Sequence, residues 1–419
     1  MKELPKLNLS KSFAEFEKAK KLIPGGVLGI RRPYNFVPGE YPIFFESGKG
    51  GRVTDIDGNE YIDYLCAYGP VIIGYREAEV DDAVIAQMKE KGFCFSLMQR
   101  YQNILAEKLR ELIPSAEMSL FVLTGSDATS TAIRLARSYT GKTKIIRCGY
   151  HGWHDWCVET KGGIPKKLYE DVYEVHYNDL EELETLLKTN KDDMAAVIIT
   201  PFGHPLAAEM QEPKKGYLEA VKALTHKYGA VLIFDEIRTG FRVSIGGAQE
   251  YYGVRPDLSV FGKAIANGHP LGVVCGREDI MKRGELDVFI SSTFFSNSTG
   301  YVAALKTIEI LQRDKIIDAV WEKGKYLMDG IKKHLKTYES VGAELTGIPP
   351  MMFITFKKDD NKTYKDKRTD FYTQLIRRKV FLQPYHHGYV CYRHTKEDLT
   401  YTVNAIGESL AYLKEKYVK

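Results

Sequence analysis

Residues 231–241 read VLIFDEIRTGF, in which four apolar residues run directly into Asp235 and Glu236. A short, wholly apolar run of this kind predicts a buried strand of a parallel sheet. A carboxylate at the end of such a strand is costly to bury without a partner. No lysine, histidine pair or cysteine cluster adjoins Asp235, so we expect its partner to come from a distant part of the chain.

Similar strand-like runs recur through the middle of the chain and alternate with helical patterns. The runs are SLFVLTGS (119–126), KIIRCGYHG (144–152), AAVIITPFG (195–203), DLSVFGK (257–263) and LGVVCG (271–276). Strands that alternate with helices predict the α/β class, with a mostly parallel sheet covered by helices. We expect a large domain at 51–305 and a small α+β domain built from both ends, 1–50 and 306–419.

The composition excludes several classes of protein. A net charge of +4 over 419 residues is too small to indicate a nucleic-acid or membrane-surface partner. No apolar stretch approaches the roughly 18 residues that span a bilayer. The six cysteines show no CxxC motif and no disulfide-like spacing, which is typical of reduced thiols. We therefore expect a cytoplasmic enzyme without nucleic-acid or membrane partners.

Lys263 follows the run DLSVF in the way that Asp235 follows VLIF. In parallel sheets, ligands bind beyond the carboxyl ends of the strands, so both side chains are expected to face one crevice. A desolvated lysine there is an amine nucleophile of the kind that forms Schiff bases. Asp235 would then hold a protonated heterocyclic nitrogen. Pyridoxal phosphate (PLP) needs this lysine and this carboxylate.

The remaining requirements of PLP also have candidates at strand ends. Gly125, Ser126 and Asp127 lie at a strand-to-helix turn, where helix N-terminal amides favour a phosphate. Tyr150 offers an aromatic ring to stack on the cofactor, and His151 beside it is a further candidate contact.

Each of these features also has a simpler interpretation. An aspartate at a strand end commonly caps a helix or joins an ion pair, and a lysine after a strand is commonly exposed. The TGSDA sequence could merely start a helix, since serine and aspartate are good N-caps. Arg238 could bind a substrate anion or pair with Glu236. His151 and His154 have an HxxH spacing, but no nearby acid completes a zinc site, so we predict no metal.

The ordered motifs resemble those of class III (ω-type) PLP aminotransferases, in particular the branch of glutamate-1-semialdehyde 2,1-aminomutase. They are IPGGV (23–27), DIDGNEYIDY (55–64), GPVIIGY (69–75), TGSDATSTAIRLARSYTG (124–141), YHGWHDW (150–156), DEIRTGFR (235–242), GGAQEYYGVRPDL (246–258), GKAIANGHPLG (262–272) and STF (292–294). The resemblance implies the type I PLP aminotransferase fold, whose large domain holds a seven-stranded-type sheet.

The resemblance also implies roles for single residues. Lys263 would form the Schiff base with PLP and move protons, and Asp235 would hold the ring nitrogen. Ile237 would pack on the ring face opposite Tyr150. Thr293 would reach the phosphate in the neighbouring subunit, which implies a homodimer with a shared active site.

The sequence indicates the substrate less closely than it indicates the cofactor. The resemblance places a carboxylate-binding arginine at Arg32, and the pair His386 and His387 resembles aminotransferases that act on sugars and related carbonyls. We therefore expect an aminotransferase that moves an amino group from an amino acid donor to a semialdehyde, keto or sugar-like acceptor. The alternative is the aminomutase itself. A non-catalytic binding protein is a third possibility, against which the joint presence of Lys263, Asp235 and Thr293 argues.

Overall fold

The computed structural model describes residues 4–27, 33–203 and 210–418. The chain forms two compact units. The large unit is Ala78–Ile317, and the small unit combines Met1–Glu77 with Asp318–Lys419. The expected boundaries were 50/51 and 305/306. The small unit extends past residue 50 because the strand Glu60–Asp63 pairs with the strand Val380–Phe381 of the C-terminal segment.

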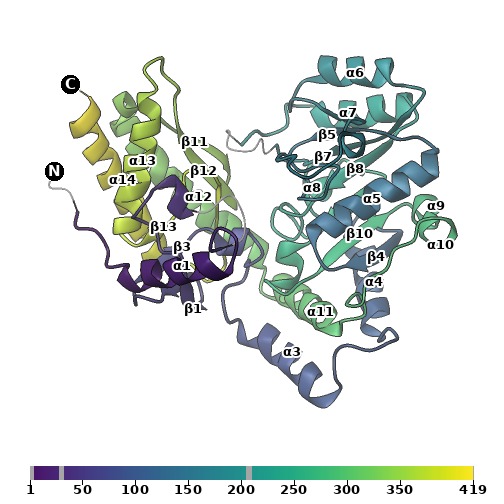
Figure 1. Cartoon of the computed structure of the whole chain (residues 1–419), viewed down its shortest axis with the longest axis horizontal. Helices are drawn as coiled ribbons and strands as arrows, with labels where there is room; N and C mark the ends of the chain where they lie inside the picture. Colours follow the sequence, from purple (N-terminus) through teal and green to yellow (C-terminus); the bar gives the residue numbers. More distant parts are fainter. Residues whose placement is uncertain (1–3, 28–32, 204–209, 419) are drawn as a thin grey trace. The chain divides into compact units, whose positions relative to one another are not determined.

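The small unit contains two sheets and the helices that pack on them (Figure 1). A four-stranded sheet has the order β1 (Phe45–Lys49), β2 (Arg52–Asp55), β3 (Glu60–Asp63) and β13 (Val380–Phe381). A three-stranded sheet has the order β11 (Ala343–Ile348), β12 (Met351–Phe356) and β14 (Gly388–Tyr389). The helices are α1 (Ser10–Leu22), α2 (Pro33–Phe36), α12 (Ile316–Thr337), α13 (Thr363–Arg377) and α14 (Lys396–Tyr417).

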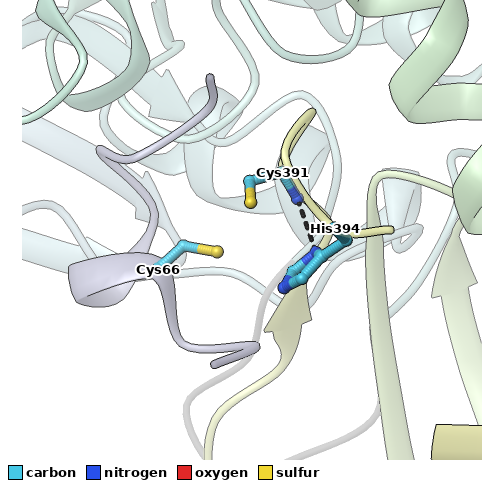
Figure 2. Close-up of side chains that lie close together, drawn as sticks. All are labelled: Cys66, Cys391 and His394. Atoms are coloured by element: carbon cyan, nitrogen blue, oxygen red, sulfur yellow. Dashed lines mark hydrogen bonds between the residues drawn. The ribbon is translucent and has the colours of Figure 1, made fainter. Parts of the chain in front are cut away.

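One buried cluster of the small unit has the composition of a metal site. The side chains of Cys66, Cys391 and His394 place their ligand atoms within 4.8 Å of one another (Figure 2). Both ring nitrogens of His394 are already engaged, because the backbone N–H of Cys391 donates to Nδ1 (3.1 Å) and Nε2 contacts the carbonyl oxygen of Asp63 (3.0 Å). A metal would have to displace one of these hydrogen bonds, so this cluster carries no metal assignment.

The large unit is built on a seven-stranded sheet with the order β4-β10-β9-β8-β7-β5-β6. Its strands are β4 (Met118–Val122), β5 (Lys144–Cys148), β6 (Val172–Glu174), β7 (Met194–Ile199), β8 (Val231–Asp235), β9 (Leu258–Phe261) and β10 (Gly272–Gly276). Strand β10 runs antiparallel to both of its neighbours, and the other neighbouring pairs are parallel. The predicted α/β class and mostly parallel sheet are confirmed.

Helices cover both faces of this sheet (Figure 1). On one face, Ile198 and Ile233 pack with the buried side of α5. On the other, Ile199 and Phe234 pack with α6 and α7. Successive side chains of a strand point to opposite faces of the sheet. Because helices cover both faces, these strands carry apolar side chains on both faces. The helices of the unit are α3 (Ala78–Glu90), α4 (Tyr101–Leu112), α5 (Gly125–Thr140), α6 (Leu180–Thr189), α7 (Tyr217–Lys227), α8 (Ala248–Tyr251), α9 (Glu278–Met281), α10 (Arg283–Leu286) and α11 (Ser298–Arg313).

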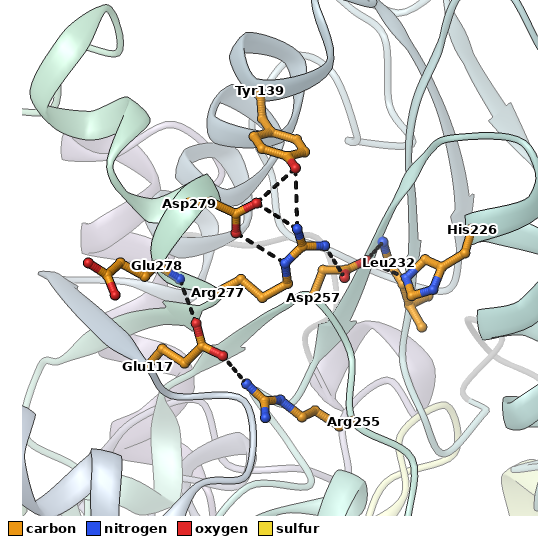
Figure 3. A network of polar contacts seen from close by, with 9 residues as sticks. All are labelled: Glu117, Tyr139, His226, Leu232, Arg255, Asp257, Arg277, Glu278 and Asp279. Carbon is orange, nitrogen blue, oxygen red and sulfur yellow. Dashed lines mark hydrogen bonds and ion pairs between the residues drawn. The ribbon is translucent and has the colours of Figure 1, made fainter.

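An ionic network ties strands together at the sheet edge where β8 and β9 begin (Figure 3). Asp257, which precedes β9, is buried and accepts hydrogen bonds from the backbone N–H of Leu232 (2.8 Å) and from Nη1 of Arg277 (2.9 Å). His226 of α7 contacts the same carboxylate at 2.8 Å. The network therefore joins β8, β9, β10 and α7 on the side away from the carboxyl ends of the parallel strands.

We predict that Asp257→Ala lowers the free energy of unfolding of the cofactor-free protein by about 2–4 kcal/mol, because buried donors lose their acceptor. Urea titration measures this value. The matched control is Arg255→Gln, which breaks the half-exposed Arg255–Glu117 pair of the same network and is expected to cost less than about 1 kcal/mol. Equal, small effects of both variants would contradict the structural role of Asp257.

Candidate active site

Asp235 and Lys263 lie at the same edge of the large sheet. Asp235 ends β8, and Lys263 follows β9 after Gly262. The two strands are parallel neighbours in which Asp235 pairs with Val260, so their carboxyl ends coincide. The backbone of Lys263 has φ of 50°, in the left-handed region, which costs a non-glycine residue of order 1–3 kcal/mol. The fold thus holds Lys263 in a conformation that it would not adopt alone.

The surroundings of Lys263 lower the pKa of its amine and so favour the neutral form. Burial and the positive charges of Arg238 and Arg242 outweigh the attraction of Asp235 and lower the pKa of Lys263 to about 7. Near neutral pH a large fraction of this amine is therefore unprotonated and able to attack a carbonyl or accept a proton. Arg242, which is fully buried, contributes to this effect and was not singled out from the sequence.

The distant partner expected for Asp235 is His151. Its Oδ2 lies 2.7 Å from Nδ1 of His151, and its Oδ1 accepts the backbone N–H of Ile237 (3.1 Å). His151 is held in turn by the hydroxyl of Thr129, which donates to its carbonyl oxygen (2.7 Å). Both Asp235 and His151 are buried. Nε2 of His151 has no hydrogen-bond partner among the described residues.

The start of α5 forms a complete capping box. The hydroxyl of Thr124 accepts the backbone N–H of Asp127 (3.2 Å), and the carboxylate of Asp127 accepts the backbone N–H of Thr124 (2.9 Å). Asp127, predicted above to contact the cofactor, therefore uses its N–H and Oδ2 in the cap, while its Oδ1 lies 3.9 Å from Nε2 of His154. Gly125 and Ser126 are the residues whose position at the first turn suits an anion.

Ile237 joins the three segments that carry these groups. A Cβ added to Gly125 would lie 3.1 Å from Cδ1 of Ile237, and so would a Cβ added to Gly262. A hydrogen bond links Ser126 to the segment after β5, because the hydroxyl of Ser126 accepts the backbone N–H of Trp153 (3.2 Å). The turn before α5, the end of β8, the start of η3 (Lys263–Ala266) and the segment after β5 therefore converge at one place.

Glu236, the neighbour of Asp235, is structural. Its buried carboxylate accepts the backbone N–H groups of Ala248 (2.8 Å) and Gln249 (2.9 Å), and also the hydroxyl of Thr239. These bonds fix the start of α8 to the end of β8. The adjacent acids thus serve different purposes, since Asp235 faces the cluster around Lys263 and Glu236 stabilises the fold.

The other predicted site residues lie on separate segments of the chain. Tyr150 is 44% exposed, and Thr293 lies in an exposed segment before α11. His386 and His387 are buried in the small unit, with their rings stacked at 4.3 Å between centroids. Arg32 lies outside the described residues.

Comparison with known proteins identifies the family. The profile of the family described as Aminotransferase class-III matches residues 36–406. The chain belongs to this family. A 3-aminobutyryl-CoA aminotransferase of Cloacimonas acidaminovorans (strain Evry) is 65% identical over 410 residues, which cover 98% of this chain and 99% of that protein. A glutamate-1-semialdehyde 2,1-aminomutase of Natranaerobius thermophilus is 34% identical, over 94% of this chain and 97% of that protein.

Solved structures agree with this assignment. The PLP internal aldimine form of the Sphingopyxis sp. MTA144 FumI protein superposes with a TM-score of 0.92 at 29% identity, covering 98% of both chains. An omega-transaminase from Sphaerobacter thermophilus has a TM-score of 0.87 at 26% identity, covering 97% of this chain and 98% of its own. The protein is a PLP-dependent aminotransferase with the type I fold, as the sequence predicted.

The clustered residues fit PLP chemically. The site combines an amine with a lowered pKa, a buried carboxylate and a helix start suited to a phosphate. It also contains a buried imidazole nitrogen, Nε2 of His151, whose hydrogen-bonding capacity is unused among the described residues. An unused buried polar atom is costly unless a ligand or water engages it.

From the pKa of Lys263 we predict how the rate of PLP binding depends on pH. Below pH 7 the amine is mainly an ammonium ion and cannot attack an aldehyde, whereas above pH 7 it is mainly neutral. The rate at which cofactor-free protein captures PLP should therefore rise through a midpoint near pH 7 and level off above it. Stopped-flow absorbance measures this rate, with Lys263→Ala as the control that forms no covalent product. A midpoint near the ordinary lysine value would contradict the assigned environment.

Proposed function

We propose that the protein transfers the amino group of 3-aminobutyryl-CoA, or of a closely similar 3-aminoacyl-CoA, to a keto acid. The observation that carries this proposal is the 65% identity, over nearly the whole of both chains, to a protein with that activity in its name. With 2-oxoglutarate as acceptor, the products are 3-oxobutyryl-CoA and L-glutamate, and the reverse direction uses glutamate as donor. This narrows the expected carbonyl class to a keto group and favours it over a semialdehyde or a sugar.

The roles we propose for the residues follow from their contacts. Lys263 would form the covalent bond to PLP, and Asp235, which contacts His151, would hold the ring nitrogen. The start of α5, at Gly125 and Ser126, takes the phosphate. When bound, PLP supplies an aldehyde that condenses with amines and a ring that withdraws electrons from the amine-bearing carbon.

Tyr150 and Ile237 would pack against opposite faces of the ring. Ile237 is suited to this because its side chain lies between Gly125 and Gly262. Absence of a Cβ at both glycines leaves room for the isoleucine, so the ring face would be apolar on this side. Tyr150 precedes His151 directly and is exposed enough to meet a ligand.

Lys263 would also carry out the proton transfer. Its surroundings lower the pKa of Lys263 to about 7, so Nζ would accept a proton once the incoming substrate amine has displaced it. It would remove the proton from C3 of the 3-aminoacyl group, which is the carbon that bears the amine, and Nζ would hold that proton until it is given back within the site. A base with a pKa near the working pH suits both directions of this transfer.

The aminomutase reaction is the second candidate. It is supported by relatives that are 34% identical, which is about half the identity to the aminobutyryl-CoA enzyme. An aminomutase moves an amino group within one molecule and requires no keto acid. This requirement distinguishes the two candidates in a single assay.

We predict that PLP-loaded protein converts 3-aminobutyryl-CoA and 2-oxoglutarate into 3-oxobutyryl-CoA and glutamate, with both products rising in equal amounts. Mass spectrometry of the mixture measures them. Free 3-aminobutyrate is the matched control, and its kcat/KM should be lower by about 100-fold, because it lacks the binding energy of the CoA portion. Equal use of the free acid would contradict the CoA proposal. Isomerisation of glutamate 1-semialdehyde without a second substrate would instead support the aminomutase.

We also propose that the protein acts as a homodimer in the cytoplasm. The large unit exposes apolar side chains on two segments, which include Leu97 (81%) and Phe294 (55%). The segments lie together, because the hydroxyl of Ser296 donates to the carbonyl oxygen of Phe95 (2.7 Å). Exposed apolar surface of this kind is typical of an interface. All six cysteines are free thiols, which supports a reducing compartment.

If Thr293 completes the active site of the neighbouring subunit, as we propose, two inactive variants should complement each other. Lys263→Ala and Thr293→Ala should each be poorly active alone, because each removes a group from every site. When the two variants are unfolded, mixed and refolded together, heterodimers should contain one complete site, restoring about a quarter of the wild-type sites. Sedimentation establishes the dimer, and the aminotransferase assay measures the recovery. An active monomer, or a mixture no more active than its components, would contradict a shared site.

A further inference from the structure

Thr200 is a buried polar residue at the functional edge that the roles above leave unused. It directly follows β7, and its backbone N–H donates to the carbonyl oxygen of Cys148 at the end of β5 (3.2 Å). The side chain is only 2% exposed. Its hydroxyl has no hydrogen-bond partner among the described residues. A valine would fill this space without the cost of an unsatisfied hydroxyl.

The register of the sheet places Thr200 beside Asp235. Strands β7 and β8 are parallel, and Ile199 pairs with Phe234, so the next residues along, Thr200 and Asp235, are also neighbours. Paired residues of adjacent strands point to the same face, and adjacent strands are about 4.8 Å apart. On both strands this is the face covered by α5, because Ile198 and Ile233 pack into the core beneath α5.

Two buried polar atoms without partners therefore accompany Asp235 at this edge: the hydroxyl of Thr200 and Nε2 of His151. The hydroxyl can donate, and it is positioned on the strand that lies between β8 and β5. The ligand expected at Asp235 is the pyridine ring of PLP, which carries an ionisable oxygen on C3, an aldehyde on C4 and the phosphate arm on C5.

The strand order determines which ring substituent faces β7. Lys263 lies on the β9 side of Asp235 and would receive C4. The start of α5, which would receive the phosphate arm, lies against β10, since a Cβ added to Gly272 would lie 2.5 Å from the carbonyl oxygen of Thr124. Strands β9 and β10 both lie on one side of β8, and β7 lies on the other. If C5 is directed toward β10 in this way, the oxygen on C3 would be directed toward β7.

We propose that the hydroxyl of Thr200 donates a hydrogen bond to the oxygen on C3 of the PLP ring and so positions the ring and lowers the basicity of that oxygen. This role rests on the proposed placement of the ring nitrogen at Asp235. Thr200 is thus a cofactor-positioning residue, and its hydroxyl, rather than its bulk, is what the site requires.

The test compares Thr200→Val with Thr200→Ser in the cofactor-loaded protein. Loss of the donor leaves the C3 oxygen more basic, so Thr200→Val should raise the pH midpoint of the visible absorption band of bound PLP by about one unit. It should also weaken PLP binding, measured by titrating cofactor-free protein, by about tenfold. Thr200→Ser, which keeps the hydroxyl, should shift both values much less.

Thr307→Val is the matched control, because Thr307 of α11 also has a buried hydroxyl without a partner among the described residues. It should leave both the spectral midpoint and PLP binding unchanged. The proposal is overturned if Thr200→Val behaves like Thr307→Val, or if Thr200→Ser behaves like Thr200→Val. It is also overturned if binding weakens without a spectral shift, since that indicates packing alone. Asp235→Asn is assayed in parallel, and wild-type PLP affinity and turnover in that variant would refute the ring placement itself, whatever Thr200 does.

Discussion

The contact between the buried carboxylate of Asp235 and His151 is the constraint on which the site depends. The two residues are 84 positions apart, and their 2.7 Å contact joins the ends of β8 and β5 across β7. A buried carboxylate is tolerated only where hydrogen bonds and charge compensate its desolvation. Asp235 also attracts the ammonium form of Lys263, but burial and the charges of Arg238 and Arg242 outweigh this attraction and lower the pKa of Lys263 to about 7.

The parallel sheet makes this arrangement possible. Because β5, β7, β8 and β9 all run in one direction, short segments far apart in sequence deliver their side chains to one edge. Capping groups such as Thr124 and Asp127 fix the start of α5, and the ionic network of Asp257 fixes the opposite edge. The fold therefore separates residues that stabilise it from residues that face the ligand.

Much of this could be predicted from the sequence, because apolar runs that end in Asp235 and Lys263 are local signals. The partner of Asp235 could not be found locally, since the contact with His151 arises only when β5 and β8 share a sheet. Asp127 could not be assigned from the sequence for another reason. The TGSDA pattern fits both a phosphate site and a helix cap, and the structure shows the side chain of Asp127 in the cap. Thr200 carried no signal, because its relation to Asp235 depends on strand register.

The most direct measurement of the central claim is the position of the covalent bond to the cofactor. PLP-loaded protein is reduced with borohydride, digested and sequenced by mass spectrometry. If the sheet edge described above is the active site, the pyridoxyl group will be found on Lys263, and prior addition of an amino donor will prevent the labelling. A label on another lysine, or no label on a protein that binds PLP, would contradict the account.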